Sequence, residues 1–115
     1  VEEFYLLSAE CAARLGNDAG ARTTMIELLD NRMADADGTV ASVSDIQEFI
    51  YLQTKIELWG EGKSYYAMKR NQATVTRGTN HVYRGGESFA YDIDEMSFQI
   101  PEDEINNNPS ISEQN

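Results

Sequence analysis

The fold is decided by the first stretch of the chain, residues 4–17, which reads FYLLSAECAARLGN. Apolar side chains recur along it at steps of three and four, at Phe4, Leu7, Cys11 and Leu15. This period predicts an amphipathic helix that turns this stripe to the core, and the intervening alanines favour a helix. Gly16-Asn17 is expected to end it, because glycine readily adopts the left-handed conformation that follows a helix.

A second helix is predicted to begin at once, with Asp18 as its N-cap. Its inward side chains are expected to be Ala21, Met25, Leu28, Leu29 and Met33. Because the connecting loop is only a few residues long, the two helices are predicted to be antiparallel neighbours.

A further pair of helices is expected after a loop over residues 35–43. The sequence from Ser44 to Gln47 fits a capping box, in which each of the two side chains satisfies a free backbone N–H group. The third helix is expected to bury Ile46, Phe49, Ile50, Ile56 and Trp59 and to end or bend at Gly60 and Gly62. A short fourth helix from about Ser64 to Arg70 would bury Tyr65, Tyr66 and Met68.

The helical period is lost after Arg70. Residues 71–99 are predicted to form short strand-like or irregular segments with a turn at Gly85-Gly86, and residues 101–115 an extended tail. The expected fold class is therefore mainly α. Tetratricopeptide-like antiparallel helix hairpins over residues 1–70 precede an irregular, strand-poor segment and tail over residues 71–115 of the same domain.

Composition narrows the functions that the chain can have. The 115 residues include 20 acidic and 9 basic side chains, so the net charge is −11, which argues against general affinity for nucleic acid or anionic lipid. No apolar run approaches the ~20 residues of a membrane-spanning helix, and no signal-peptide pattern opens the sequence. One cysteine and one histidine exclude an internal disulfide and paired-histidine metal motifs.

The apolar and charged residues are both unevenly distributed. Residues 1–60 hold 16 of the 24 leucine, isoleucine, valine and phenylalanine residues, so the second half is expected to need something else to pack against. Five basic and no acidic residues lie from Lys63 to Arg84, and eight acidic and no basic residues follow from Glu87. Either the acidic segment folds over the basic one, or one of these surfaces meets another protein or another part of a larger protein.

The candidates for chemistry each have a structural explanation. Cys11 is interpreted as a buried small hydrophobe, and His81 as a polar-loop residue without an evident nucleophile or orienting acid. Glu57 and Glu61 are four apart, so they are expected to share a helix face. They could act as acid/base partners on sugars, but the favoured reading is structural. In that reading they pair with Lys55, Lys63 or Arg70, or cap the neighbouring helix. No catalytic residue, metal ligand or cofactor is assigned.

One acidic run, one glycine pair and the aromatic residues complete the candidates. The run from Glu102 to Glu104 lacks the ligand spacing of a calcium loop and is interpreted as solvated surface, and Gly85-Gly86 lacks the helix of a phosphate loop. The aromatic residues could form a platform for sugar rings, although burial in the core is the favoured reading. They are Trp59, Tyr65, Tyr66, Tyr83, Phe89 and Tyr91.

Three blocks of the sequence carry a resemblance to a known family. Residues 3–34 contain YLLSAECAARLGN and NRMA, residues 56–70 read IELWGEGKSYYAMKR, and residues 98–109 read FQIPEDEINNNP. In this order, with Gln114-Asn115 at the end, they resemble the C-terminal part of the SusD-like (RagB/SusD) outer-membrane lipoproteins of Bacteroidetes. The family usually has Arg where Lys63 stands and Asp where Ala67 stands.

The resemblance implies a function without bond chemistry. Members of this family are longer, mostly helical, lipid-anchored at the outer-membrane surface, and bind glycans or other nutrients above a SusC-like TonB-dependent transporter. It implies that this chain is part of a larger protein and is mostly scaffold, that no substrate-binding residue can be named in it, and that the lipid anchor lies outside it. The alternatives are a free-standing tetratricopeptide-like protein–protein interaction module and a glycosidase fragment that uses Glu57 and Glu61.

Overall fold

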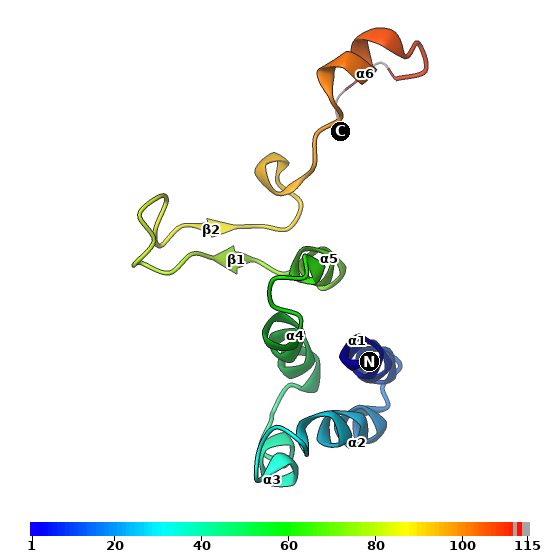
Figure 1. Cartoon of the computed structure of the whole chain (residues 1–115), viewed down its shortest axis with the longest axis vertical. Helices are drawn as coiled ribbons and strands as arrows, with labels where there is room; N and C mark the ends of the chain where they lie inside the picture. The colour runs from blue at the N-terminus through cyan, green and yellow to red at the C-terminus, as the bar shows by residue number, and fades with distance from the viewer. Residues whose placement is uncertain (112, 114–115) are drawn as a thin grey trace. The chain divides into compact units, whose positions relative to one another are not determined.

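The computed structural model describes residues 1–111 and 113. These residues form two compact units, Val1–Ala67 and the described residues from Met68 onward. The described residues are mainly helical, as predicted, with one small two-stranded sheet (Figure 1). The helices are α1 (Glu2–Arg14), α2 (Asp18–Leu29), α3 (Ala36–Ala41), α4 (Ile46–Glu57), α5 (Lys63–Arg70) and α6 (Glu102–Asn107), with a short 3-10 helix η1 (Asp94–Met96). The strands are β1 (Val75–Thr76) and β2 (Ser88–Phe89).

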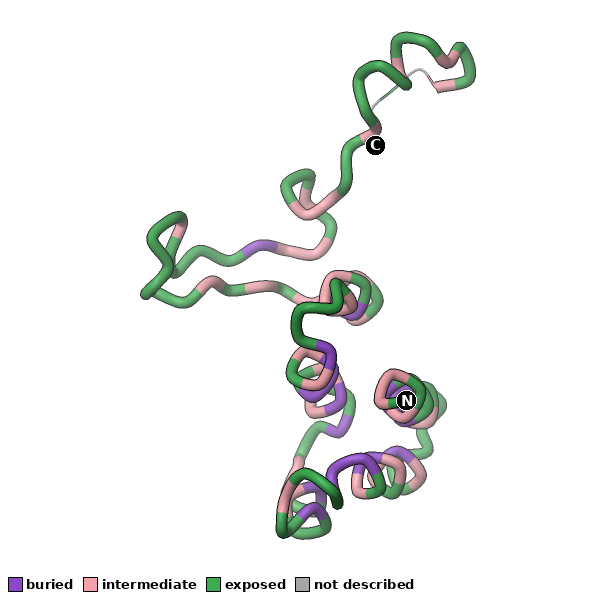
Figure 2. Tube along the Cα trace, viewed as in Figure 1, coloured by how far each residue is buried: buried purple, intermediate pink, exposed green. Residues whose placement is uncertain are grey.

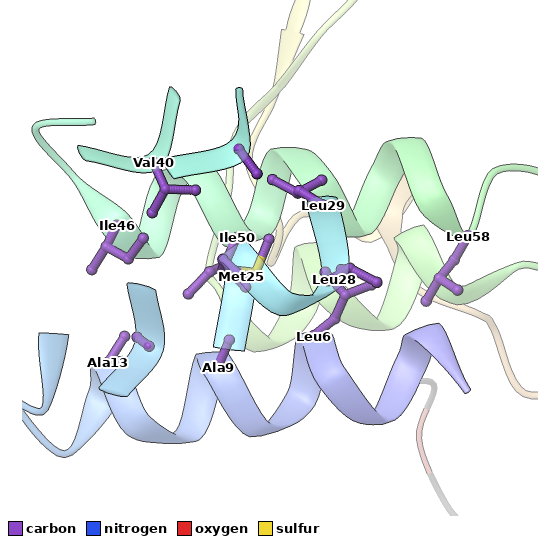
Figure 3. Packing of buried hydrophobic residues seen from close by; sticks show 12 residues of the cluster. Leu6, Ala9, Ala13, Met25, Leu28, Leu29, Val40, Ile46, Ile50 and Leu58 are labelled. Atoms are coloured by element: carbon purple, nitrogen blue, oxygen red, sulfur yellow. The ribbon is translucent and has the colours of Figure 1, made fainter. Parts of the chain in front are cut away.

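The first unit has one hydrophobic core, built where α1 packs against α2 and α4 and where α2 packs against α3. Figure 2 shows buried residues on the sides of these helices that face one another. Leu6, Ala9 and Ala13 project from α1 toward α2 and α4, where Met25 and Ile50 are fully buried (Figure 3). The small alanine side chains let the helices approach closely, while leucine, methionine and isoleucine fill the space between them.

The buried face of α1 is not the stripe that the sequence suggested. Phe4 and Leu15 are 76% and 86% exposed, Cys11 is exposed, and Leu7 lies at the margin of exposure. The interpretation of Cys11 as a buried hydrophobe was therefore wrong. Helix α1 has two apolar faces, and the face that includes Ala9 and Ala13 is the one that α2 and α4 cover.

The turn between α1 and α2 forms as predicted, but the N-cap of α2 lies one residue earlier than predicted. Gly16 has a φ of +78°, the left-handed conformation expected after a helix end. The Asn17 side chain is the N-cap and accepts a hydrogen bond from the Gly20 amide at 3.0 Å, so Asp18 is the first helical residue. Its carboxylate in the first turn still suits the helix dipole.

Residues 35–43 were predicted to be a loop, but they contain α3. Asp35 caps this helix by accepting a hydrogen bond from the Gly38 amide at 2.8 Å, and Val40 is fully buried in the core. The Arg22 guanidinium on α2 donates to the carbonyl oxygens of Val40 and Val43 at the end of α3. These bonds satisfy carbonyl groups that a helix end leaves free and fix α3 to α2.

Helix α4 is capped by Asp45, so the predicted capping box at Ser44 was wrong. The Asp45 carboxylate accepts hydrogen bonds from the amides of Gln47 and Glu48, at 2.9 and 3.0 Å. Of the predicted inward side chains, Ile46 and Ile50 are buried and Phe49 packs against the core. The predictions for Ile56 and Trp59 were wrong, because more than half of the surface of Ile56 and most of that of Trp59 are exposed.

Two glycines end α4 and lead into α5, as predicted. Gly60 and Gly62 have φ values of +81° and +73°, which L side chains rarely adopt. Helix α5 begins at Lys63 and continues to Arg70, close to the predicted bounds.

The second unit is built around a small β-hairpin. Strands β1 and β2 pair antiparallel, with Val75 opposite Phe89 and Thr76 opposite Ser88. In the loop between them, a Cβ atom added to Gly85 would lie 2.6 Å from the carbonyl oxygen of His81 and within 3.3 Å of two further carbonyl oxygens. The backbone of the loop therefore surrounds Gly85 so closely that this position has no room for a side chain.

Beyond the hairpin, hydrogen bonds hold part of the chain in place, and the chain is not wholly extended. The Lys69 ammonium donates to the carbonyl oxygen of Tyr91 and to the Ser97 hydroxyl, which fixes the segment around η1 to the end of α5. The predicted extended tail contains α6, so that prediction was wrong over residues 102–107. The predicted Gln114-Asn115 end lies outside the described residues.

Candidate functional site

A polar network of the first unit is centred on the guanidinium of Arg32, just after the end of α2. Its Nε donates to Glu57 Oε2 at 2.7 Å, its Nη2 to Glu2 Oε1 at 3.2 Å and its Nη1 to the Leu28 carbonyl oxygen at 2.9 Å. The three bonds connect the start of α1, the last turn of α2 and the last residue of α4. Sequence reasoning did not single out Arg32, although it lies in the NRMA segment that contributes to the family resemblance.

The two carboxylates that suggested acid/base chemistry do not share a helix face. Glu57 is the last residue of α4, its side chain is only 12% exposed, and it pairs with Arg32. Glu61 lies beyond the helix end, exposed in the turn, where its amide donates to the Leu58 carbonyl oxygen. The shared-face prediction was wrong. Glu57 does form an ion pair, as the favoured reading expected, but its partner is Arg32 and not one of the basic residues suggested by the sequence.

A second ion pair lies at the start of α5. Lys63 Nζ is 2.9 Å from Glu3 Oε1, so α5 is connected to the first turn of α1. The hydrogen bond and charge of Glu3 raise the pKa of Lys63 above its ordinary value. The sequence resemblance implies Arg at this position, and Lys provides the same positive charge with a single-point contact in place of a planar fork.

The single cysteine and the single histidine lie apart from any reactive arrangement in the part of the chain that the structure describes. Cys11 is on the exposed face of α1. His81 is exposed in the hairpin loop, and its Nδ1 is 3.1 Å from Nη2 of Arg77. No group of three histidine, cysteine or acidic side chains that could hold a metal ion occurs among the described residues.

The acidic and glycine-rich features have structural roles. Glu102, Asp103 and Glu104 are exposed in the first turn of α6, where negative charge favours the helix dipole, so the reading as solvated surface is confirmed. Gly85-Gly86 lies in the hairpin loop as predicted, and Gly86 has a φ of +81°. In the same unit Arg84 Nε pairs with Glu87 at 2.7 Å, and its Nη1 lies 4.0 Å from Glu95. Acidic side chains after residue 86 thus neutralise a basic one before it.

Two of the three candidate aromatic residues of the first unit are exposed. Trp59 is 84% exposed in the turn after α4, which corrects the prediction that it is core. Tyr66 on α5 is also exposed, and Tyr65 beside it is half-buried. The two tyrosine rings meet edge to face, with centroids 5.6 Å apart.

Aromatic residues of the second unit differ in their environments. Phe89 on β2 is buried, and the Arg84 guanidinium lies over its ring, 4.4 Å from the centroid. Tyr91 is half-buried, whereas Tyr83 at the apex of the hairpin loop is 71% exposed. The core reading is thus confirmed for Phe89 alone among the six aromatic candidates.

The contacts and exposed surfaces of the described residues indicate a class of protein. Among the described residues, the charged clusters of the first unit connect helices, several aromatic rings are exposed, and no helix is long and apolar enough to cross a membrane. Such an arrangement is typical of a helical scaffold or binding protein.

Comparison with known families identifies the chain. The sequence matches the SusD family over residues 2–115, so the chain belongs to this family. This is a family of carbohydrate- or nutrient-binding proteins associated with the outer membrane surface, and it is not a family of enzymes. No curated protein and no solved structure matches the chain.

Proposed function

We propose that this chain is the C-terminal scaffold of a glycan- or nutrient-binding protein that passes its ligand to a SusC-like TonB-dependent transporter. The family match over residues 2–115 is the observation that carries this proposal. The protein acts by binding and hand-over at the cell surface, without making or breaking bonds. It has no need of a cofactor or of nucleic acid.

The scaffold role is supported by apolar surface that the first unit does not cover itself. The outer face of α1 exposes Phe4, Leu7 and Leu15, and α4 and its following turn expose Leu52, Ile56 and Trp59. Burying one such side chain is worth about 1.5–3 kcal/mol, so two uncovered stripes favour association with another apolar surface.

The proposed covering is further helices of the same protein. Stacked helix pairs bury one face within each pair and the other against the next pair, so an internal pair without its next neighbour exposes an apolar face. In the first unit, α1 already packs against both α2 and α4, and its outer stripe remains. A larger helical protein of this family would supply the missing neighbour.

Attachment to the membrane is proposed to occur through a lipid anchor outside this chain. The net charge of −11 opposes binding of the chain itself to an anionic membrane surface. No described helix can span a membrane. The ligand would then be bound at the outer surface of the outer membrane, next to the transporter.

Calorimetry and co-purification test the binding function. The whole protein is titrated with a panel of neutral and acidic oligosaccharides, and its complex with the co-expressed transporter is purified through a tag on the transporter. We expect saturable binding of at least one oligosaccharide class and recovery of both proteins together. If no oligosaccharide binds and the transporter is recovered alone, the proposed function is wrong.

Alkylation of Cys11 tests the scaffold role separately, because this thiol lies on the outer stripe of α1. The chain of residues 1–115 and the whole protein are treated with a maleimide, and labelling of the peptide that contains Cys11 is followed by mass spectrometry. Helices that cover the stripe would slow labelling in the whole protein by about tenfold or more, since burial restricts reagent access. Both samples are also labelled in denaturant, where the rates should agree. Equal rates under native conditions would contradict the covering.

A further inference from the structure

We draw no further inference here: the strongest candidate, the exposed pair Val82 and Tyr83 at the apex of the loop between β1 and β2, carries nothing because nothing in the structure shows what covers it.

Discussion

Replacing Arg32 with methionine should destabilise the first unit through the loss of three contacts at once. Methionine keeps the aliphatic part of the side chain but cannot donate to Glu57, Glu2 or the Leu28 carbonyl oxygen. The Glu57 carboxylate, 12% exposed, would lose its cation in a place that water reaches poorly.

The expected cost lies between two limits. Exposed ion pairs contribute about 0–1 kcal/mol, and breaking a fully buried pair costs about 3–5 kcal/mol. Glu2 is about half exposed, so its bond to Arg32 belongs near the lower limit, whereas the bond of Glu57 lies between the two. Together with the bond to the Leu28 carbonyl, we expect a loss of about 2 kcal/mol.

Hydrogen exchange of backbone amides in α1, α2 and α4 measures this loss. A change of about 2 kcal/mol in opening free energy accelerates exchange about 30-fold, because each 1.4 kcal/mol is about a factor of ten. Glu2→Gln is the matched control and should accelerate exchange by about twofold or less, since its side chain is already well solvated.

A double-mutant cycle assigns the effect to the Arg32–Glu57 pair. Glu57→Gln alone removes the charge but leaves an acceptor, and we expect it to cost about 1 kcal/mol. In the Arg32→Met/Glu57→Gln variant the two losses should not add, because the second change removes the unpaired carboxylate. Full additivity, or exchange less than about threefold faster in Arg32→Met, would refute this account of the network.

The remaining predictions concern caps, turns and the core. Asp45→Ala should lower the free energy of unfolding by about 1 kcal/mol, because two amides at the start of α4 lose their acceptor. Ser44→Ala should change the thermal stability little. A larger effect of Ser44→Ala than of Asp45→Ala in circular dichroism melts would show that Ser44 is the cap. Gly16→Ala should cost about 1 kcal/mol in urea unfolding because its φ is +78°, and Gly16→Asn should cost less; equal stability of all three proteins would show that the turn does not require the left-handed conformation. Met25→Ala should cost about 2–5 kcal/mol in the same assay because Met25 is fully buried, and a loss below about 1 kcal/mol would mean that the helices collapse onto the cavity.

The helices of the first unit could be predicted from sequence because their periods and end signals are strong, but the buried face of α1 could not. Its apolar residues follow two stripes, and a period alone does not say which stripe the neighbouring helices cover. The stripe with larger side chains, including Phe4 and Leu15, was favoured, yet the helices pack on the side of Ala9 and Ala13. Close helix contact favours small side chains there, a property of the partner surfaces and not of α1 alone.

Other differences from the sequence predictions have local causes. Helix α3 was missed because Gly38, Thr39 and Val40 have low helix propensity, and its stability comes from the Asp35 cap and from bonds donated by Arg22, which is distant in sequence. The caps of α2 and α4 were each displaced by one residue, because neighbouring side chains such as Ser44 and Asp45 are both good N-caps. Glu57 pairs with Arg32, which lies 25 positions away in the sequence, so no local sequence pattern predicts this ion pair.

The crowded position in the hairpin loop gives a practical rule for examining related chains. Three carbonyl oxygens surround the point where residue 85 would carry its first side-chain carbon, so even alanine would force the peptide units around it to rotate. A relative that keeps glycine there can retain the same loop path when its apex residues differ. A relative with any larger residue must follow another path, and modelling its hairpin on this one would misplace the residues at the tip.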